Sequence, residues 1–171
     1  VQTSVNYDLS LTSDTAGVEN LTLTSGAGLT GTGNDLANLM TGNAGGDTLN
    51  GGLGNDALLG EGGNDTITYL MGSGADSVDG GAGTDTLNIV ANGIDETLDL
   101  IVNAAGVVTQ IEGGAITNVE TITVNLGGGN DRISYAGSAS GVTVNLAVAA
   151  GTGLASLPIP RTLRVRPKLI H

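Results

Sequence analysis

Apolar and polar residues alternate with a short period along most of the chain, and no segment shows the spacing of an amphipathic helix. In residues 1–32, apolar residues recur at every second position from Val5 to Leu11 and again from Leu21 to Leu23, with threonine and serine nearby. This alternation is typical of short, half-buried strands. We therefore predict an all-β chain in which residues 1–32 form an N-terminal β cap.

The pattern changes to a nine-residue period between Gly33 and Asn88. Each unit has a glycine-rich segment that ends in aspartate or asparagine, and an apolar residue follows two positions later. The units are GNDLANLMT (33–41), GNAGGDTLN (42–50), GGLGNDALL (51–59), GEGGNDTIT (60–68) and, after the insertion Tyr69-Leu70, MGSGADSVD (71–79) and GGAGTDTLN (80–88). The last unit fits G-G-x-G-x-D-x-U-x at every defined position, and this nonapeptide is a known signature of calcium-binding parallel β-helices.

The period also predicts an architecture. If six residues of each unit form a turn and three form a strand, two units make one coil, and every second unit stacks on the same side. One apolar residue per unit then points inward, and these residues are Met40, Leu49, Leu58, Ile67, Val78 and Leu87. We expect the insertion to bulge the stack between Asp65 and Asp76. The predicted fold is a right-handed parallel β-roll or β-helix solenoid with flanking irregular β-coils.

Downstream of the repeats the spacing lengthens. Residues 89–156 are predicted to be a β extension with longer coils, with strands at 98–102, 107–111, 119–126 and 142–148. One isolated unit, LGGGNDRIS (126–134), contains Asp131, for which a structural turn and a metal ligand are both open. Residues 157–171 form a basic tail with three prolines, which we expect to be disordered.

Composition narrows the possible partners. The chain has no Phe, no Trp, no Cys and only three Tyr, so its core must be thin and aliphatic, as in a solenoid. Residues 1–160 hold all 17 acidic side chains and a single basic one, Arg132. This negative charge disfavours binding to nucleic acid and to anionic membranes, and it favours binding of divalent cations. No stretch reaches the roughly 20 apolar residues of a membrane helix, so no membrane insertion is expected. Because the chain starts at Val1, we expect it to be a piece of a longer protein.

Stacked turns of this kind offer hard oxygen ligands. Glycines allow positive φ and let backbone carbonyls converge, and calcium takes about six to eight oxygens. The predicted pairs across stacked turns are Asp47 with Asp65, Asp65 with Asp85, Asp56 with Asp76 and, more weakly, Asn38 with Asp56. Without a counterion the aspartates would repel each other, so the repeats are expected to fold only with calcium.

The segments GGLGND (51–56), GEGGND (60–65) and GGAGTD (80–85) resemble the RTX, or haemolysin-type, calcium-binding repeat family. The resemblance implies a bacterial protein that the type I secretion machinery exports, located outside the cell or on its surface. It also implies that backbone carbonyls join the aspartates as calcium ligands, here those of Gly51, Gly52, Gly60, Gly80 and Gly81. Asn43 and Glu61 stand where a second glycine is usual, and Met71 replaces a first glycine.

Other functions are weighed against this one. The chain has no helical zinc motif, nucleophile elbow or phosphate-binding loop, so it is not expected to be an enzyme itself. It could be the appendage of a secreted enzyme, or a spacer or self-associating segment of an adhesin or surface-layer protein. Several acidic residues are expected to be solvated surface charges: Asp8, Asp14, Asp35, Asp95, Asp99, Glu112 and Glu120.

Overall fold

The computed structural model describes residues 1–10, 17–91, 93–128 and 131–136. Within these ranges the regular elements are all strands, and no helix occurs that could cross a membrane. The strands are β1 (Gln2–Thr3), β2 (Tyr7–Asp8), β3 (Asn20–Leu23), β4 (Thr30–Thr32), β5 (Leu39–Thr41), β6 (Thr48–Asn50), β7 (Ala57–Leu59), β8 (Thr66–Leu70), β9 (Ser77–Asp79), β10 (Thr86–Val90), β11 (Thr97–Val102), β12 (Val108–Ile111), β13 (Gly114–Thr117), β14 (Thr121–Asn125) and β15 (Arg132–Ala136). The predicted all-β class is confirmed.

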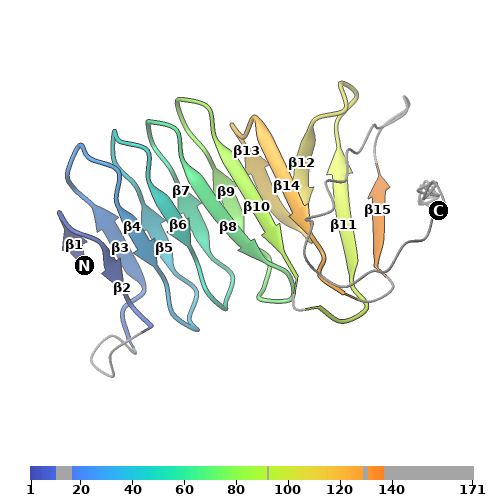
Figure 1. Ribbon diagram of the computed structural model, residues 1–171, viewed down its shortest axis with the longest axis horizontal. Helices are drawn as coiled ribbons and strands as arrows, with labels where there is room; N and C mark the ends of the chain where they lie inside the picture. Colours follow the sequence, from blue (N-terminus) through green and yellow to red (C-terminus); the bar gives the residue numbers. More distant parts are fainter. Residues whose placement is uncertain (11–16, 92, 129–130, 137–171) are drawn as a thin grey trace.

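From β1 to β11 successive strands alternate between two sheets, so the chain winds as a parallel β-solenoid of about four turns (Figure 1). The first sheet has the order β1-β3-β5-β7-β9-β13-β12-β11-β15, and the second has the order β14-β10-β8-β6-β4-β2. Equivalent positions lie 18 residues apart in the first repeats and 20 apart after the insertion. The nine-residue period therefore corresponds to half a coil, as predicted.

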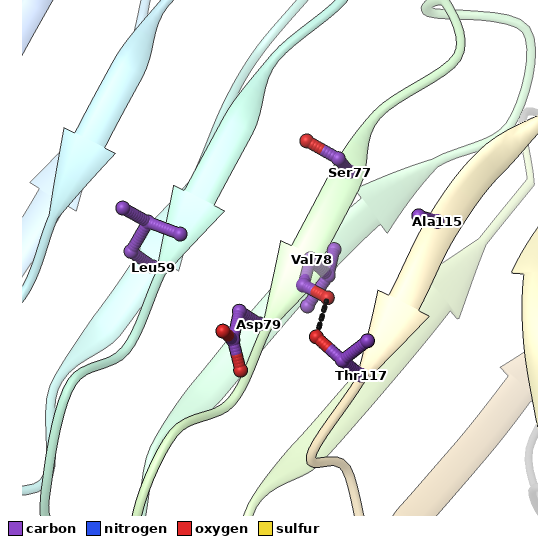
Figure 2. Close-up of a pocket in the computed structure, with 6 residues that line it drawn as sticks. All are labelled: Leu59, Ser77, Val78, Asp79, Ala115 and Thr117. Carbon is purple, nitrogen blue, oxygen red and sulfur yellow. Dashed lines mark hydrogen bonds between the residues drawn. The ribbon is translucent and has the colours of Figure 1, made fainter.

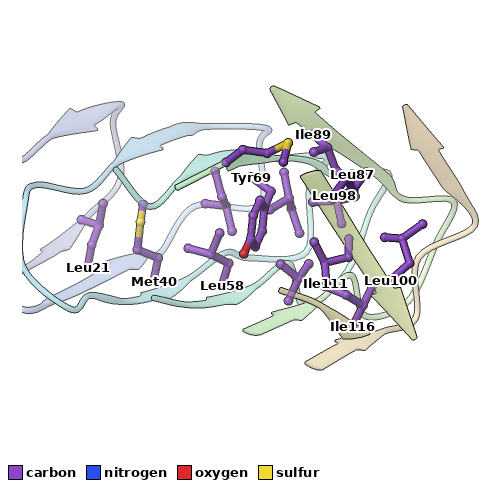
Figure 3. Packing of buried hydrophobic residues seen from close by; sticks show 14 of the residues in the cluster. Leu21, Met40, Leu58, Tyr69, Leu87, Ile89, Leu98, Leu100, Ile111 and Ile116 are labelled. Atoms are coloured by element: carbon purple, nitrogen blue, oxygen red, sulfur yellow. The ribbon is translucent and has the colours of Figure 1, made fainter. Parts of the chain in front are cut away.

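The core is a ladder of single side chains between the two sheets (Figure 3). All six residues predicted to point inward are buried, with at most 2% of their surface exposed. Leu9, Leu21 and Leu23 extend the ladder toward the N-terminus. Strands β5 to β10 thus contribute one or two buried apolar side chains each, and this explains how the chain forms a core without Phe or Trp.

The insertion Tyr69-Leu70 does not bulge the stack, contrary to the prediction. It lengthens β8, and the next coil lengthens β10 to match, with Ile89 paired to Tyr69 and Val90 to Leu70 in continuous register. Tyr69 is completely buried, and its hydroxyl donates to the Gly74 carbonyl at 2.8 Å. The added pair therefore widens the core.

The C-terminal coils are longer and partly antiparallel. β11, β12 and β13 pair as an antiparallel meander, which the sequence did not predict, and β13 then lies parallel to β9. Figure 2 shows this junction, where the Thr117 hydroxyl donates to the Val78 carbonyl. β14 and β15 return to parallel pairing with β10 and β11. The predictions for residues 142–148 and 157–171 lie outside the described residues.

Candidate metal centre

The turns between strands form two rows along the solenoid (Figure 1). We call the turns that lead into the second sheet the first row, and those that lead into the first sheet the second row. The first row contains residues 24–29, 42–47, 60–65 and 80–85, and the second row contains 33–38, 51–56 and 71–76. Turns of one row stack because their strands pair in parallel.

The last residue of each repeat turn is buried. The exposed fraction is between 0 and 2% for Asn38, Asp47, Asp56, Asp65, Asp76 and Asp85. Burying a carboxylate is unfavourable unless donors or a cation compensate it. The partners of each oxygen therefore indicate what the turns can bind.

One oxygen of each carboxylate accepts the backbone N–H of the equivalent residue one coil earlier. The distances are 2.6 Å from Asp47 N to Asp65 Oδ1, 2.8 Å from Asp65 N to Asp85 Oδ1, 2.9 Å from Asp56 N to Asp76 Oδ1 and 2.8 Å from Asn38 N to Asp56 Oδ1. The structure thus brings together all four residue pairs that the period predicted. These hydrogen bonds fix the carboxylates in the interface between consecutive turns of a row.

The second oxygen of three of these carboxylates is buried and has no hydrogen-bond donor. These atoms are Oδ2 of Asp56, Asp65 and Asp85. Each lies against the first glycine of its own turn, where a Cβ on Gly51, Gly60 or Gly80 would overlap it or crowd it. The glycines therefore leave room for the carboxylate to fold back over the turn.

Burial also changes the acidity of the aspartates. Loss of solvent raises the pKa of Asp65 to about 6, and the charges of Asp85 and Asp47 add to this effect. Loss of solvent likewise raises the pKa of Asp76 to about 6 and raises that of Asp56. The carboxylates are thus poised to accept either a proton or a cation.

Backbone oxygens face the same interfaces. The carbonyl oxygens of Gly51, Gly60 and Gly80 lie against the first glycine of the preceding turn in their row. Gly52 and Gly81 have φ of 91° and 95°, a conformation that favours glycine. The described residues contain no group of three Asp, Glu, His or Cys side chains that could hold a metal. A cation here would therefore need backbone carbonyls to complete its ligands.

Hydrogen bonds between a backbone N–H and a carboxylate one coil away also occur in the long C-terminal coils. Glu120 is exposed, as expected for a solvated charge, and its Oε2 also accepts the Asp85 N–H at 2.7 Å across 35 residues. Glu96, which we did not single out, donates its N–H to Asp131 Oδ1 at 3.2 Å, so these two residues pair across one coil.

A signal in the sequence could have found both glutamates. The triplets Glu96-Thr97-Leu98 and Glu120-Thr121-Ile122 have the same form as Asp85-Thr86-Leu87 in the repeats. An acidic residue before a threonine and an aliphatic residue marks the start of these strands.

The fold and its turns define a class of protein, a parallel β-solenoid whose glycine-rich nonapeptide turns end in buried carboxylates. The family model of the RTX calcium-binding nonapeptide repeat matches residues 31–67 and 72–88, in four copies. This segment of the chain belongs to the RTX calcium-binding repeat family, so the chain contains an RTX repeat module. Searches against curated proteins and against solved structures return no match.

Proposed function

We propose that residues 33–88 are a structural calcium-binding module of a secreted or surface-exposed bacterial protein, and that the module folds when it meets calcium outside the cell. The ligands would be the carboxylates of Asp47, Asp56, Asp65, Asp76 and Asp85, the side chain of Asn38, and the carbonyls of Gly51, Gly52, Gly60, Gly80 and Gly81. Calcium would neutralise the buried charge of each row and crosslink consecutive coils.

The observation that carries this proposal is the set of buried carboxylate oxygens without donors on Asp56, Asp65 and Asp85. A buried, unpaired charge costs several kcal/mol, roughly, even after relaxation of its surroundings. A hard divalent cation removes this cost, because calcium prefers carboxylate and carbonyl oxygens and tolerates irregular geometry. The neighbouring backbone carbonyls supply ligands of the same type.

The family supports the location. RTX repeat proteins are generally secreted, and calcium affinities on the order of 10⁻⁴–10⁻³ M are typical of extracellular modules. With such affinities the chain would stay unfolded during export and fold afterwards. In this role the module would stabilise neighbouring domains and bias their folding toward the outside.

Circular dichroism during a calcium titration tests the proposal, with magnesium at equal ionic strength as the control. We expect little β signal in chelator, a cooperative gain of β structure near millimolar calcium, and no gain with magnesium, which binds in rigid octahedral geometry and keeps its waters. A chain that is β-rich in chelator and unchanged by millimolar calcium would contradict the proposal. Equal folding by both cations would reduce the effect to charge screening.

A further inference from the structure

The first nonapeptide turn of each row differs from the turns that follow it. The turns 33–38 and 42–47 carry asparagine at their second position, whereas the turns 51–56 and 80–85 carry glycine there. We infer that the side-chain amides of Asn34 and Asn43 occupy the first interface of each row in place of a cation, so that calcium binding begins one interface later. The statement about where calcium binding begins rests on the proposed function.

The contacts of Asn43 show how an amide can take this place. Its Nδ2 donates to Asp47 Oδ1 at 2.9 Å and to the carbonyl of Ala27, in the preceding turn of the first row, at 3.1 Å. Its backbone N–H donates to Asp47 Oδ2 at 2.7 Å. Both oxygens of Asp47 therefore have donors, whereas Oδ2 of Asp65 and Oδ2 of Asp85 have none.

Asn34 makes the equivalent bridge in the second row. Its Nδ2 donates to the Val18 carbonyl at 3.0 Å, across the same separation of 16 residues as in the contact from Asn43 to Ala27. The Nδ2 of Asn38 donates to the same carbonyl at 3.2 Å and to Asn34 Oδ1 at 3.2 Å. This interface is closed by two neutral amides and has no carboxylate at the end of its turn.

The backbone supports the distinction independently. In the later turns the second and fourth positions have positive φ, at Gly52 and Gly54, Glu61 and Gly63, Gly72 and Gly74, and Gly81 and Gly83. No residue of the turns 33–38 and 42–47 has positive φ, although Gly45 stands at a fourth position. The amide-bridged turns therefore follow a different path, which directs a side-chain donor into the interface.

An amide group offers two donors, enough to join an oxygen from each of two turns without introducing a charge. The oxygens that a cation would need are then already satisfied, and a cation would have to displace the amide. The buried oxygens without donors belong to the turns 51–56, 60–65 and 80–85. Calcium would therefore enter the interfaces that these turns form with their predecessors, and not the first interface of each row.

Two substitutions at Asn43 test the inference in the full chain. Asn43→Asp keeps the shape and the acceptor for the Gly45 N–H but removes the amide donor, and Asn43→Gly restores the residue found in the later turns. The control is Asn103→Asp, which adds the same charge to an exposed asparagine that accepts the Ala105 N–H in the same way. Calorimetry counts the bound calcium, and hydrogen exchange at the lowest calcium concentration that keeps the wild type folded reports on residues 42–50.

We expect both Asn43 variants to bind one more calcium ion than the wild type, and residues 42–50 to exchange at least about tenfold faster at the lowest calcium concentration that keeps the wild type folded. Asn103→Asp should match the wild type in both measurements. Unchanged stoichiometry in both Asn43 variants overturns the inference; if Asn43→Asp fails to fold with calcium, Asn43→Gly alone decides. If no protein binds calcium, the proposed function fails, and the exchange rates still decide whether the amide closes the interface.

Discussion

The short coils of residues 33–88 and the long coils of residues 93–136 both place an acidic residue before a strand, yet they bury it to different degrees. In the short coils the carboxylates are at most 2% exposed, whereas Glu120 in the long coils is exposed and Glu96 and Asp131 are half-buried. In both regions the carboxylate accepts a backbone N–H from the previous coil. The hydrogen bond therefore requires only parallel register, and deep burial requires glycine turns stacked closely on both sides.

The comparison shows that the acidic side chain before each strand can have two roles, accepting a backbone N–H and binding a cation. Closing the open end of a strand needs one carboxylate oxygen, and the 35-residue coils achieve this as well as the short ones do. Binding a cation needs a second buried oxygen and a set of carbonyls, which the 18- and 20-residue coils bring together. Glu96 keeps one buried oxygen without a donor, so the long coils retain part of this arrangement.

The largest effect is expected from Asp65→Asn, because Asp65 lies in the middle of the first row and contacts both neighbouring turns. The amide keeps the shape but loses the charge that attracts calcium. We predict that the calcium concentration at the folding midpoint rises at least about tenfold, equivalent to roughly 1.4 kcal/mol. Circular dichroism during a calcium titration measures this midpoint.

The matched control is Asp99→Asn in the long coils. Asp99 is exposed and accepts the Ser134 hydroxyl at 2.6 Å, a bond that an amide oxygen can also accept. Its midpoint should stay within about twofold of the wild type, since an exposed carboxylate outside the rows loses little on neutralisation. Equal shifts for the two variants would mean that calcium responds to total charge and not to the rows.

The second effect concerns space in the turn. A Cβ at Gly60 would overlap both Asp65 Oδ2 and the Gly80 carbonyl, whereas a Cβ at Gly128 meets only the Gly93 carbonyl at 3.9 Å. Overpacking of this kind costs roughly 1–3 kcal/mol. Gly60→Ala should therefore lose that much stability in calcium, measured by urea denaturation, and Gly128→Ala should lose almost none. A harmless Gly60→Ala would show that the first glycines are not needed for close stacking.

The repeats could be predicted well because their information is local. A nine-residue period is enough to place Leu49 beside Ile67 and Asp47 beside Asp65, since parallel register repeats every second unit. The effect of Tyr69-Leu70 could not be predicted from the unit that contains it, because the matching pair Ile89-Val90 lies in the next coil.

Contacts across the long coils could not be predicted from the sequence, because these coils have no regular repeat. Glu120 reaches Asp85 across 35 residues, and β13 reaches β9 only after the antiparallel meander has folded. The role of Asn43 was equally hidden, since its residue type indicates only a departure from glycine. Whether its amide points into the interface depends on the φ of the turn, which the sequence pattern does not specify.

The third effect is that the pH dependence of stability has opposite signs with and without calcium. The folded pKa of about 6 for Asp65 and Asp76 exceeds the ordinary 3.8, so without calcium the folded state binds more protons between these values. Without calcium, stability should fall as the pH rises from about 4 through 6. In calcium the order reverses, because protons compete for the ligands, and the calcium midpoint should rise below pH 6 by roughly tenfold per pH unit for each displaced proton. Circular dichroism in calcium-free buffer from pH 4 to 8 measures the first trend, and calcium titrations at the same pH values measure the second; parallel trends would contradict the assignment.

The smallest effect concerns backbone strain in the two regions. Glu61 has φ of 72° in a position where the later turns have Gly52 or Gly81, and Asn118 of the long coils has φ of 50°. A residue with a Cβ pays roughly 1–2 kcal/mol in this conformation, although asparagine tolerates it better. Glu61→Gly should therefore gain about 1 kcal/mol in calcium, measured by urea denaturation. Asn118→Gly should gain nothing, because it also loses the 2.8 Å bond from Asn118 Nδ2 to Asp79 Oδ1. An equal gain in both variants would mean that the strain is not specific to the short coils. A loss of stability in Glu61→Gly would mean that the glutamate side chain stabilises its turn.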